Sequence, residues 1–201
     1  MCPLSRYCQK QLNNNGFTLV ELLVGIAICS ILILSFYSVY IYCINASRIS
    51  EEKEDIILNG RYAIEFIKNE VRSADEIIPI ERIPNYNKKY SKNFGFVIKK
   101  KIDITSSKSE GIEKEYKNKY IIYYINGDYL RRDVAIKKTD HFPKKREFEG
   151  NNTIVGNIKS IENSYTDFNR KIIVISLVFK GKWNKELEFN TEIAIRSPIN
   201  Y

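Results

Sequence analysis

An uninterrupted apolar run near the start of the chain constrains its fold more than any other feature. From Leu22 to Ile44 the sequence contains 23 residues without a charged side chain. As a helix, such a run is long enough to span the hydrocarbon core of a bilayer, about 30 Å thick. A secretory signal peptide is the alternative, but its apolar region has about 7 to 15 residues and ends in a small-residue cleavage site. The run therefore predicts a transmembrane helix, assigned here to residues 17–44.

The charges on the two sides of this segment predict its orientation. Residues 1–16 carry Arg6 and Lys10 and no acid, whereas Arg48 and Lys53 on the far side are mixed with acidic residues. Basic residues favour the cytoplasmic side of a membrane. We therefore expect a single-pass protein of the cell membrane with its N-terminus in the cytoplasm and its C-terminal part outside.

An acid lies inside the apolar segment. Glu21 follows four residues after Phe17, and Gly16 stands directly before the segment. An ionised carboxylate near the edge of a membrane segment costs on the order of a few kcal/mol. An ordinary membrane anchor would explain the apolar run, but it would explain neither this acid nor the preceding glycine.

The residues Gly16-Phe17-Thr18-Leu19-Val20-Glu21, with a basic stretch before them and an apolar run after them, resemble a known motif. They are similar to the cleavage and methylation site of type IV prepilins and type II secretion pseudopilins. The resemblance implies a leader peptide, residues 1–16, which a prepilin peptidase removes by cutting between Gly16 and Phe17 on the cytoplasmic side. It also implies methylation of the new amino group of Phe17. Glu21 then becomes the fifth residue of the mature chain.

Elementary electrostatics offers a reason for the acid in this motif. Cleavage creates an amine on Phe17 at the head of an apolar helix, and Glu21 lies one helical turn further on. A buried carboxylate needs a partner of opposite charge, and the Phe17 amine of the same or a neighbouring subunit can supply it. In a bundle of such helices this pair would fix the axial register. We assign Glu21, together with Thr18, to assembly and register.

The helix is predicted to continue beyond the membrane as an amphipathic segment, residues 45–78. This stretch contains no proline until Pro79. Apolar or small residues recur along it with helical spacing, and Gly60 on the same stripe indicates close packing or a slight bend. The residues on the stripe are Ile49, Ile56, Gly60, Ile64, Ile67, Val71, Ala74 and Ile78.

The remainder, residues 79–201, is predicted to form a globular β-sheet head. The best local signal is Asn126-Gly127 between two β-prone runs, which predicts a hairpin with a two-residue type I′ turn. Apolar residues alternate in 171–181 and again in 186–198, where Leu187, Phe189, Thr191, Ile193 and Ile195 are predicted to face inward. Further strands are expected at 94–100 and within 153–168; loops are expected at 79–93, 103–118, 137–153 and 181–185.

A long helix with one apolar stripe, followed by about five antiparallel strands with one apolar face, predicts an α+β fold. The pilin resemblance implies the same pilin-like arrangement. The stretch from Arg61 to Ala74 also resembles the PilW-like minor pilins and the J-type minor pseudopilins, as do Leu130-Arg131-Arg132 and the final strand ending at Arg196.

The head shows no sequence signature of an enzyme or of a metal site. His141 is the only histidine and lies in a Lys/Pro-rich loop, and no nucleophile or phosphate-binding motif is present. All four cysteines (Cys2, Cys8, Cys29 and Cys43) precede the head, which leaves it without a disulfide framework or a thiolate metal site. We therefore expect no cofactor and no catalytic residue.

Together with these observations, the resemblance implies a minor type IV pilin-like structural subunit, stored in the membrane and assembled into a filament, with a place in its tip or initiation complex. The expected partners are other major and minor pilin subunits, the prepilin peptidase and an inner-membrane assembly platform; the mature protein would then lie in an extracellular pilus or pseudopilus. Alternatives are a pseudopilin of a type II secretion or competence DNA-uptake machine, a single-pass enzyme or sensor, or a head that binds DNA or a surface. The formal charge of +8 and the lysine runs interleaved with tyrosines motivate the possible DNA contact.

Overall fold

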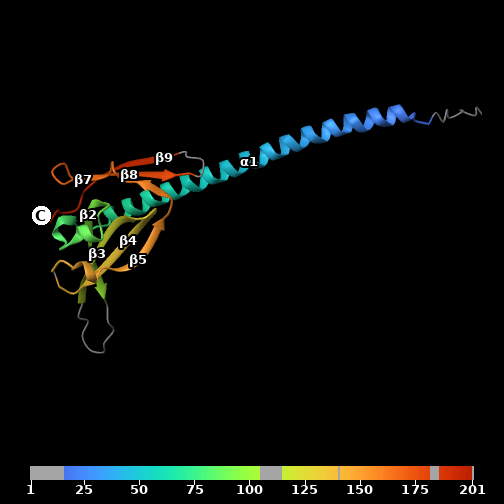
Figure 1. Ribbon diagram of the computed structural model, residues 1–201. Helices are drawn as coiled ribbons and strands as arrows, with labels where there is room; N and C mark the ends of the chain where they lie inside the picture. The colour runs from blue at the N-terminus through green and yellow to red at the C-terminus, as the bar shows by residue number, and fades with distance from the viewer. Residues whose placement is uncertain (1–15, 105–114, 140, 182–185, 201) are drawn as a thin grey trace, which may run out of the picture. The chain divides into compact units, whose positions relative to one another are not determined.

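The computed structural model describes the chain except for residues 1–15, 105–114, 140, 182–185 and 201. The chain divides into two units, residues 1–50 and residues 51–201. Helix α1 (Leu19–Arg72) contributes to both, and the strands belong to the second (Figure 1). Residues 1–15 of the predicted leader, 105–114 of the loop predicted at 103–118 and 182–185 of the loop predicted at 181–185 lie outside the described residues. The predicted bounds of two loops are wrong, because 103–104 and 115–118 of the first and 149–153 of the loop predicted at 137–153 belong to strands.

In the first unit, α1 is apolar on all sides. Its large apolar side chains from Phe17 to Tyr42 are exposed. Its serine hydroxyls are satisfied within the helix, since Ser30, Ser35 and Ser38 each donate to the carbonyl four residues earlier at 2.7–3.0 Å. Internal satisfaction of polar groups is what an apolar solvent requires of a helix.

In the second unit, α1 buries one stripe. Ile56, Gly60, Ala63, Ile67 and Val71 are the buried residues, and they recur with the period of one helix face. The predicted stripe is confirmed over this stretch, although it omitted Ala63 and included Ile49, which is exposed.

The helix ends at Arg72, so the predicted end at residue 78 is wrong. The Ser73 hydroxyl donates to the carbonyls of Asn69 and Glu70 at 2.7 and 3.3 Å. Glu76–Pro79 forms strand β1 instead of a last helical turn. Pro79 explains part of this change, because a proline disfavours helical backbone in the residue before it. Ile77 and Ile78 then point to opposite faces of a sheet, and both are buried.

Two antiparallel sheets follow the helix. The first has the order β1-β2-β3-β4-β5, with β2 (Asn93–Ile104), β3 (Glu115–Asn126), β4 (Tyr129–Lys137) and β5 (Glu149–Val155). In the second, β8 (Ile172–Lys180) pairs with β9 (Glu186–Ala194) on one side and with β6 (Ile158–Ser160) and β7 (Tyr165–Asp167) on the other. Short 3₁₀ turns lie at Ile80–Arg82, Tyr86–Lys88 and Lys145–Glu147.

The α+β class is confirmed, but the expectation of one sheet with about five strands is not. The region 153–168 breaks into separate strands after Gly156. Asn157 adopts a left-handed φ of 61° there, and a turn closes where Ser164 N donates to the Ile161 carbonyl at 2.8 Å. The chain can therefore change from the first sheet to the second.

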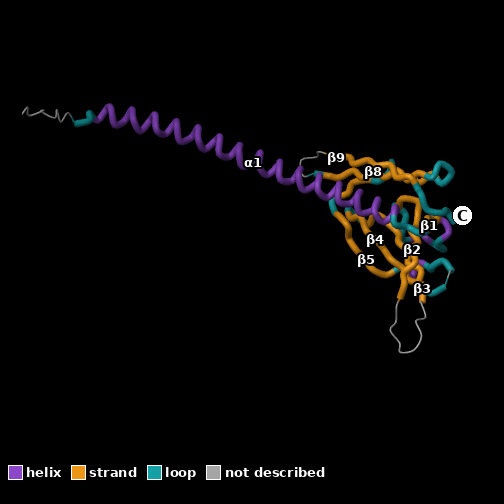
Figure 2. Tube along the Cα trace, turned by 180° about the vertical axis from the view of Figure 1, so that it is seen from behind, coloured by secondary structure: helices purple, strands orange, loops and turns teal. Residues whose placement is uncertain are grey.

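The second half of α1 lies between the two sheets (Figures 1 and 2). Its stripe, one face of the first sheet and the inner face of the second form one apolar cluster, which we call the helix-side core. A second cluster, the loop-side core, covers the opposite face of the first sheet. It consists of Ile78, Ile80, Ile83, Tyr90, Val97, Tyr120, Ile122, Tyr124, Ala135 and Phe148.

The first sheet is thus buried on both faces, which corrects the expectation of a single apolar face. Strand β3 shows this most clearly, because Ile121 and Tyr123 belong to the helix-side core whereas Tyr120, Ile122 and Tyr124 belong to the loop-side core. A strand buried on both faces reads as a continuous apolar run rather than an alternation. The alternation predicted for β8 and β9 is confirmed, since Ile173, Ile175, Leu177, Phe179 and Ile193 are buried.

The predicted hairpin is confirmed, with its turn one residue later than expected. Asn126 pairs with Tyr129, so the two turn residues are Gly127 and Asp128. Among the described residues, Gly127 has φ of 61° and Asp128 is not in the positive-φ region. Type I′ needs positive φ at both positions, whereas type II′ needs it at the first only. The turn therefore matches type II′, with glycine first.

The last described residues cover the edge of the first sheet. Ile77 N donates to the Pro198 carbonyl at 3.0 Å, and Asn200 N donates to the Ile77 carbonyl at 3.1 Å. The Ser197 hydroxyl donates to the Ala74 carbonyl at 2.7 Å. The strand predicted for 186–198 therefore ends earlier, at Ala194, and its remainder pairs with β1.

Candidate processing and assembly site

The start of α1 is fixed by a reciprocal contact between Thr18 and Glu21. Thr18 N and Thr18 Oγ1 both donate to Glu21 Oε2, at 2.9 and 3.0 Å. In return, Glu21 N donates to Thr18 Oγ1 at 3.2 Å. Because the helix begins at Leu19, Thr18 is the N-cap and Glu21 the third helical residue. The four residues form a capping box, which satisfies two of the backbone N–H groups left without partners at a helix start.

This contact gives the acid in the apolar segment a local role. Its carboxylate lies in the first helical turn, where the helix dipole favours negative charge. In the described part of the chain, the hydrogen bonds of Glu21 involve Oε2. The second oxygen, Oε1, remains available for a further donor. The contact between Thr18 and Glu21 is therefore compatible with an additional partner for the same carboxylate.

The Gly16–Phe17 bond lies just outside the helix, on exposed backbone. Gly16, Phe17 and Thr18 precede the first helical residue, and the side chain of Phe17 is 87% exposed. A Cβ added to Gly16 would meet no described atom within 4 Å. Among the described residues, therefore, no packing contact explains a glycine at this position.

A shallow groove runs along the same helix face as Glu21. Its lining residues include Gly25 and, one turn further on, Cys29 and Ser30, all with small side chains. Small residues let two helices approach closely in an apolar medium. A neighbouring helix seated in this groove would lie next to the Glu21 carboxylate.

The structure brings together two of the four predicted site residues, Thr18 and Glu21. The predicted pair between Glu21 and the Phe17 amine stays a prediction, because that amine exists only after cleavage. The capping box itself was missed in the sequence, although its signal is visible there as Thr18-x-x-Glu21 before an apolar run. Among the described residues, α1 is the helix that is long and apolar enough to cross a membrane.

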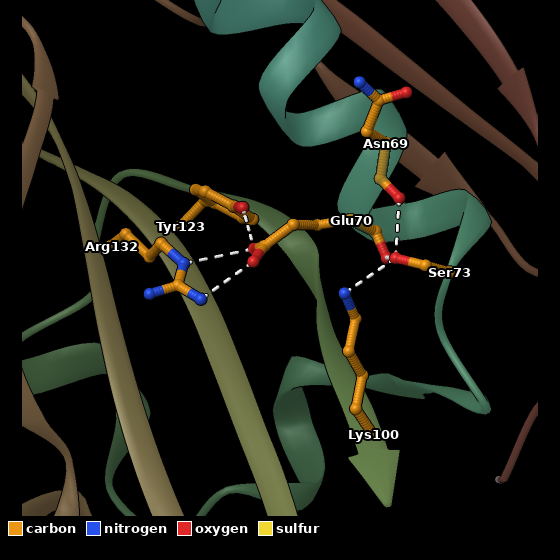
Figure 3. A network of polar contacts seen from close by, with 6 residues as sticks. All are labelled: Asn69, Glu70, Ser73, Lys100, Tyr123 and Arg132. Carbon is orange, nitrogen blue, oxygen red and sulfur yellow. Dashed lines mark hydrogen bonds and ion pairs between the residues drawn. The ribbon is translucent and has the colours of Figure 1, made fainter. Parts of the chain in front are cut away.

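In the head, a polar network joins the end of α1 to the first sheet (Figure 3). Arg132 on β4 donates to Glu70 through Nε and Nη2, at 3.1 and 2.8 Å. The hydroxyl of Tyr123 on β3 donates to the same carboxylate. Beside them, Lys100 donates to the Ser73 hydroxyl at 2.7 Å. Burial works to raise the pKa of Glu70, but the hydrogen bonds from Arg132 and Tyr123 outweigh it and lower the pKa below its usual range.

A buried acid, Asp133 on β4, lies on the opposite face of the first sheet from Arg132. Asp133 is 1% exposed and accepts hydrogen bonds from Lys89, from the Tyr90 hydroxyl at 3.0 Å and from the Tyr124 hydroxyl at 3.3 Å. Burial, and then the charge of Asp133, raise the pKa of Tyr124 to about 12. Consecutive residues of β4 thus bind elements on opposite faces of the first sheet. Arg132 binds helix α1, and Asp133 binds the loop that contains Lys89 and Tyr90.

These networks join separate elements of the head, the first linking α1 to β3 and β4 and the second linking β4 to the loop before β2. His141 is exposed in the connection between β4 and β5. In the described ranges, no group of three or more histidine, cysteine or acidic side chains could hold a metal ion. Among the described residues, lysines of the predicted basic runs take part in ion pairs: Lys89 with Asp133, Lys99 with Glu76 at 3.0 Å and Lys137 with Glu147 at 2.5 Å. Nothing in this geometry bears on the predicted DNA contact.

Comparison with known proteins supports the N-terminal assignment. Residues 11–37 match the family model described as the prokaryotic N-terminal methylation motif. The matched range contains Gly16, Phe17, Thr18 and Glu21. No curated protein and no solved structure matches the chain. The chain therefore carries a prepilin-type methylation motif on an α+β, pilin-like fold.

Proposed function

We propose that the chain is a structural subunit of a type IV pilus or of a related pseudopilus, made as a prepilin and processed at the membrane. The observation that carries the proposal is the match of residues 11–37 to the methylation motif. It coincides with an exposed glycine at the helix start, a capping box around the acid and an apolar first half of α1 whose large side chains are exposed. A motif of this type implies a structural subunit rather than an enzyme.

Processing would act at the junction between extended backbone and helix. A prepilin peptidase would hydrolyse the Gly16–Phe17 bond and release residues 1–16 as the leader, and the new Phe17 amine would be methylated. The capping box lies on the helical side of this bond. The helix start would therefore survive cleavage, and the new amine would stay within one turn of Glu21.

Assembly would replace lipid around residues 17–44 by neighbouring helices. The Glu21 carboxylate would keep its bonds to Thr18 while Oε1 receives the amine of a neighbouring subunit. A neighbour that slipped along the axis would lose this charged partner in a medium of low dielectric constant, which costs several kcal/mol. The amphipathic segment, which ends at Arg72, and the head would remain outside the membrane.

We further propose a minor position in the filament, at its tip or initiation complex. The support is the resemblance of the Arg61 to Ala74 stretch and of Leu130-Arg131-Arg132 to minor pilins. The structure adds that Glu70 and Arg132, one from each stretch, bind one another. The partners would be major and minor pilins, the peptidase and an inner-membrane assembly platform.

The primary experiment is the intact mass of the protein from cells with and without an active prepilin peptidase. The mature protein should begin at Phe17 and carry one methyl group on its amine. Gly16→Leu should block cleavage, whereas Gly25→Leu should not, since both glycines have open space around them. Retention of the leader in peptidase-positive cells would show that the motif does not function.

Incorporation into filaments tests the second step. Glu21→Ala should still be cleaved, because the scissile bond is unchanged, but should be depleted from sheared filaments. Recovery of this variant in filaments at the level of the unmodified protein would exclude the register role of Glu21. Tagging the chain and identifying the proteins that shear off with it would distinguish a pilus from a secretion or DNA-uptake filament.

A further inference from the structure

Strand β9 presents the best-preserved free edge of the two sheets. The β1 edge is covered by residues 198–200. Strand β5 has two register shifts against β4, and β6 and β7 have three residues each. Strand β9 pairs with β8 over nine residues in unbroken register and contains no proline. Natural proteins usually blunt an exposed edge with a bulge, a proline, a short strand, a cover or charged side chains. Of these, β9 shows only charged side chains among the described residues, those of Glu186, Glu188 and Glu192.

The backbone groups at this edge can be identified from contacts on the other side of β8. Ser176 N and Ser176 O both bond to the Ser164 hydroxyl at 2.8 Å, and Lys180 N bonds to the Asn157 carbonyl at 2.9 Å. The backbone N–H and C=O groups of the even-numbered residues of β8 thus point away from β9. The backbone groups of the odd-numbered residues therefore bond to β9. Their partners in β9 are also odd-numbered, from Leu187 to Ile193.

It follows that the even-numbered residues of β9 direct their N–H and C=O groups to the free edge. These residues include Glu188, Asn190 and Glu192. In the part of the chain that the structure describes, β8 is the strand that pairs with β9. Figures 1 and 2 show β9 at the outer margin of its sheet.

The side chains of the same residues give this edge a charge pattern. Glu186 pairs with Lys159 and stands opposite Lys180. Glu188 and Glu192, four residues apart, stand opposite Val178 and Val174. The Glu188 carboxylate accepts from the neutral donors Ser176 Oγ, at 2.8 Å, and Asn163 Nδ2, at 3.4 Å. The edge therefore carries two carboxylates that face no cation across β8.

We infer that the β9 edge binds an extended segment of another polypeptide that carries two basic residues four positions apart. In antiparallel pairing, these residues would stand opposite Glu188 and Glu192 and bond to their backbone groups. On the other face, apolar side chains of the segment would cover Leu187 and Phe189, which are only half-buried. Alternating pockets and charges are how an added strand gains specificity beyond its backbone bonds.

The same pattern disfavours a second copy of β9 as the partner. If two β9 strands paired antiparallel around Asn190, each Glu188 would stand opposite the Glu192 of the other copy. Like charges directly opposite one another destabilise a strand pair. The charges on the β9 edge thus disfavour pairing with a second β9 strand and favour pairing with a basic strand. The inference uses the geometry of the head alone, so it does not depend on cleavage or on filament assembly.

The probe is a synthetic peptide, acetyl-Thr-Lys-Val-Thr-Val-Lys-Val-Thr-amide, with a fluorescent label. It places its lysines opposite Glu192 and Glu188 and its valines on the inner face. We expect it to bind the full-length chain in non-ionic detergent micelles and to slow amide exchange at Glu188, Asn190 and Glu192. Failure to bind, or binding without protection of these three amides, would overturn the inference.

N-methylation of the peptide backbone distinguishes two explanations of binding: pairing with the β9 edge, and adsorption of an apolar, positively charged peptide to the micelle. Peptide residues opposite Glu188, Asn190 and Glu192 use their N–H groups toward β9, whereas the valines between them point outward. N-methylation of the two lysines and the middle threonine should weaken binding at least roughly tenfold, because several hydrogen bonds are lost. N-methylation of two valines is the matched control and should leave binding nearly unchanged. Equal binding of both peptides would contradict the inference.

A variant pair makes the same test on the protein. Asn190→Pro removes one N–H from the free edge without removing a bond to β8, a position at which proline is tolerated. Asn190→Thr keeps the N–H and is the control. The proline variant should bind the peptide roughly fivefold to tenfold more weakly than the threonine variant. Thermal unfolding of both variants verifies that the head remains folded. If the proline variant does not fold, the N-methylated peptides still test edge pairing on the unmodified protein.

Charge reversal tests the chemistry of the partner. The peptide with glutamates in place of lysines should bind at least about tenfold more weakly, and this difference should shrink as salt rises from about 0.05 M to about 0.5 M. Equal binding of the two peptides would remove the preference for a basic segment. Sedimentation of the chain alone should show no association through this edge. A dimer that disappears on Asn190→Pro would assign the edge to a second copy and overturn the inference.

Discussion

Replacement of Gly60 by alanine should destabilise the head, although the same change stabilises an ordinary helix. Gly60 is a buried helical residue of α1. A Cβ built there lies 2.6–2.7 Å from three ring carbons of Phe189 on β9. Carbon atoms without a bond between them prefer about 3.5–4.0 Å, so the ring would have to move away from its present position.

Two opposing terms set the size of the effect. Alanine is favoured over glycine in a helix interior by about 0.8–1.0 kcal/mol. The displaced ring of Phe189 would lose its edge-to-face contact with Phe179, whose centroid is 5.5 Å away, and such contacts contribute about 0.5–1.5 kcal/mol. Overpacking of a filled site costs about 1–3 kcal/mol in total. The net result for Gly60→Ala is a loss of about 1 kcal/mol.

In a Phe189→Ala background the clash is absent and only the helix preference remains. Gly60→Ala should then stabilise the head by about 0.8–1.0 kcal/mol, so the coupling between the two sites is about 2 kcal/mol. For a unit of this size, each kcal/mol corresponds to about 2–4 °C in Tm. The sign of the effect therefore reverses between the two backgrounds.

The measurement is a double-mutant cycle on the full-length chain in detergent micelles. Near-ultraviolet circular dichroism of the buried tyrosines reports unfolding of the head. Asn59→Ala, at an exposed helical position beside Gly60, is the control and should stabilise both backgrounds equally. If Gly60→Ala stabilises the unmodified protein as much as the Phe189→Ala variant, close packing is not the reason for the glycine.

Two further predictions concern the capping box and the response to pH. Thr18→Val should accelerate amide exchange at Thr18 and Glu21 and weaken the helix start by about 1 kcal/mol, whereas Thr18→Ser should preserve both; equal exchange in the two variants would argue against the capping box. Because the pKa of Glu70 is lowered in the folded head, its stabilising contribution is present above about pH 4.3 and is lost as the pH falls further. Because burial and Asp133 raise the pKa of Tyr124 to about 12, its contribution is lost as the pH rises from about 10 to about 12. Glu70→Gln should flatten the acid side of the stability profile and Tyr124→Phe the alkaline side, and unchanged profiles would contradict these assignments.

Features encoded by neighbouring residues could be predicted from the sequence. The methylation motif, the apolar helix and the stripe from Ile56 to Val71 depend on short-range spacing, and so does the hairpin at Gly127. The alternation in β8 and β9 is equally local. The capping box is local too, since Thr18 and Glu21 are three residues apart.

Features that depend on distant residues could not be predicted. Glu70 and Arg132 are 62 residues apart in sequence, and nothing near either residue indicates the other. The end of α1 is decided by the pairing of β1 with β2 and with residues 198–200, which overrides a helical pattern that continues to Ile78. The division into two sheets follows from the left-handed Asn157, one of many asparagines in the chain.

The bond between Ala74 and Ser197 spans 123 residues and has a consequence for synthesis. At about 5–20 residues per second, roughly 6 to 25 seconds separate the synthesis of the two ends of this contact. During that interval the apolar helix has already emerged, while β1 lacks the strand-like cover that residues 198–200 provide. The nascent head therefore passes through a stage in which the margin at β1 is unprotected, when a chaperone would have its clearest target.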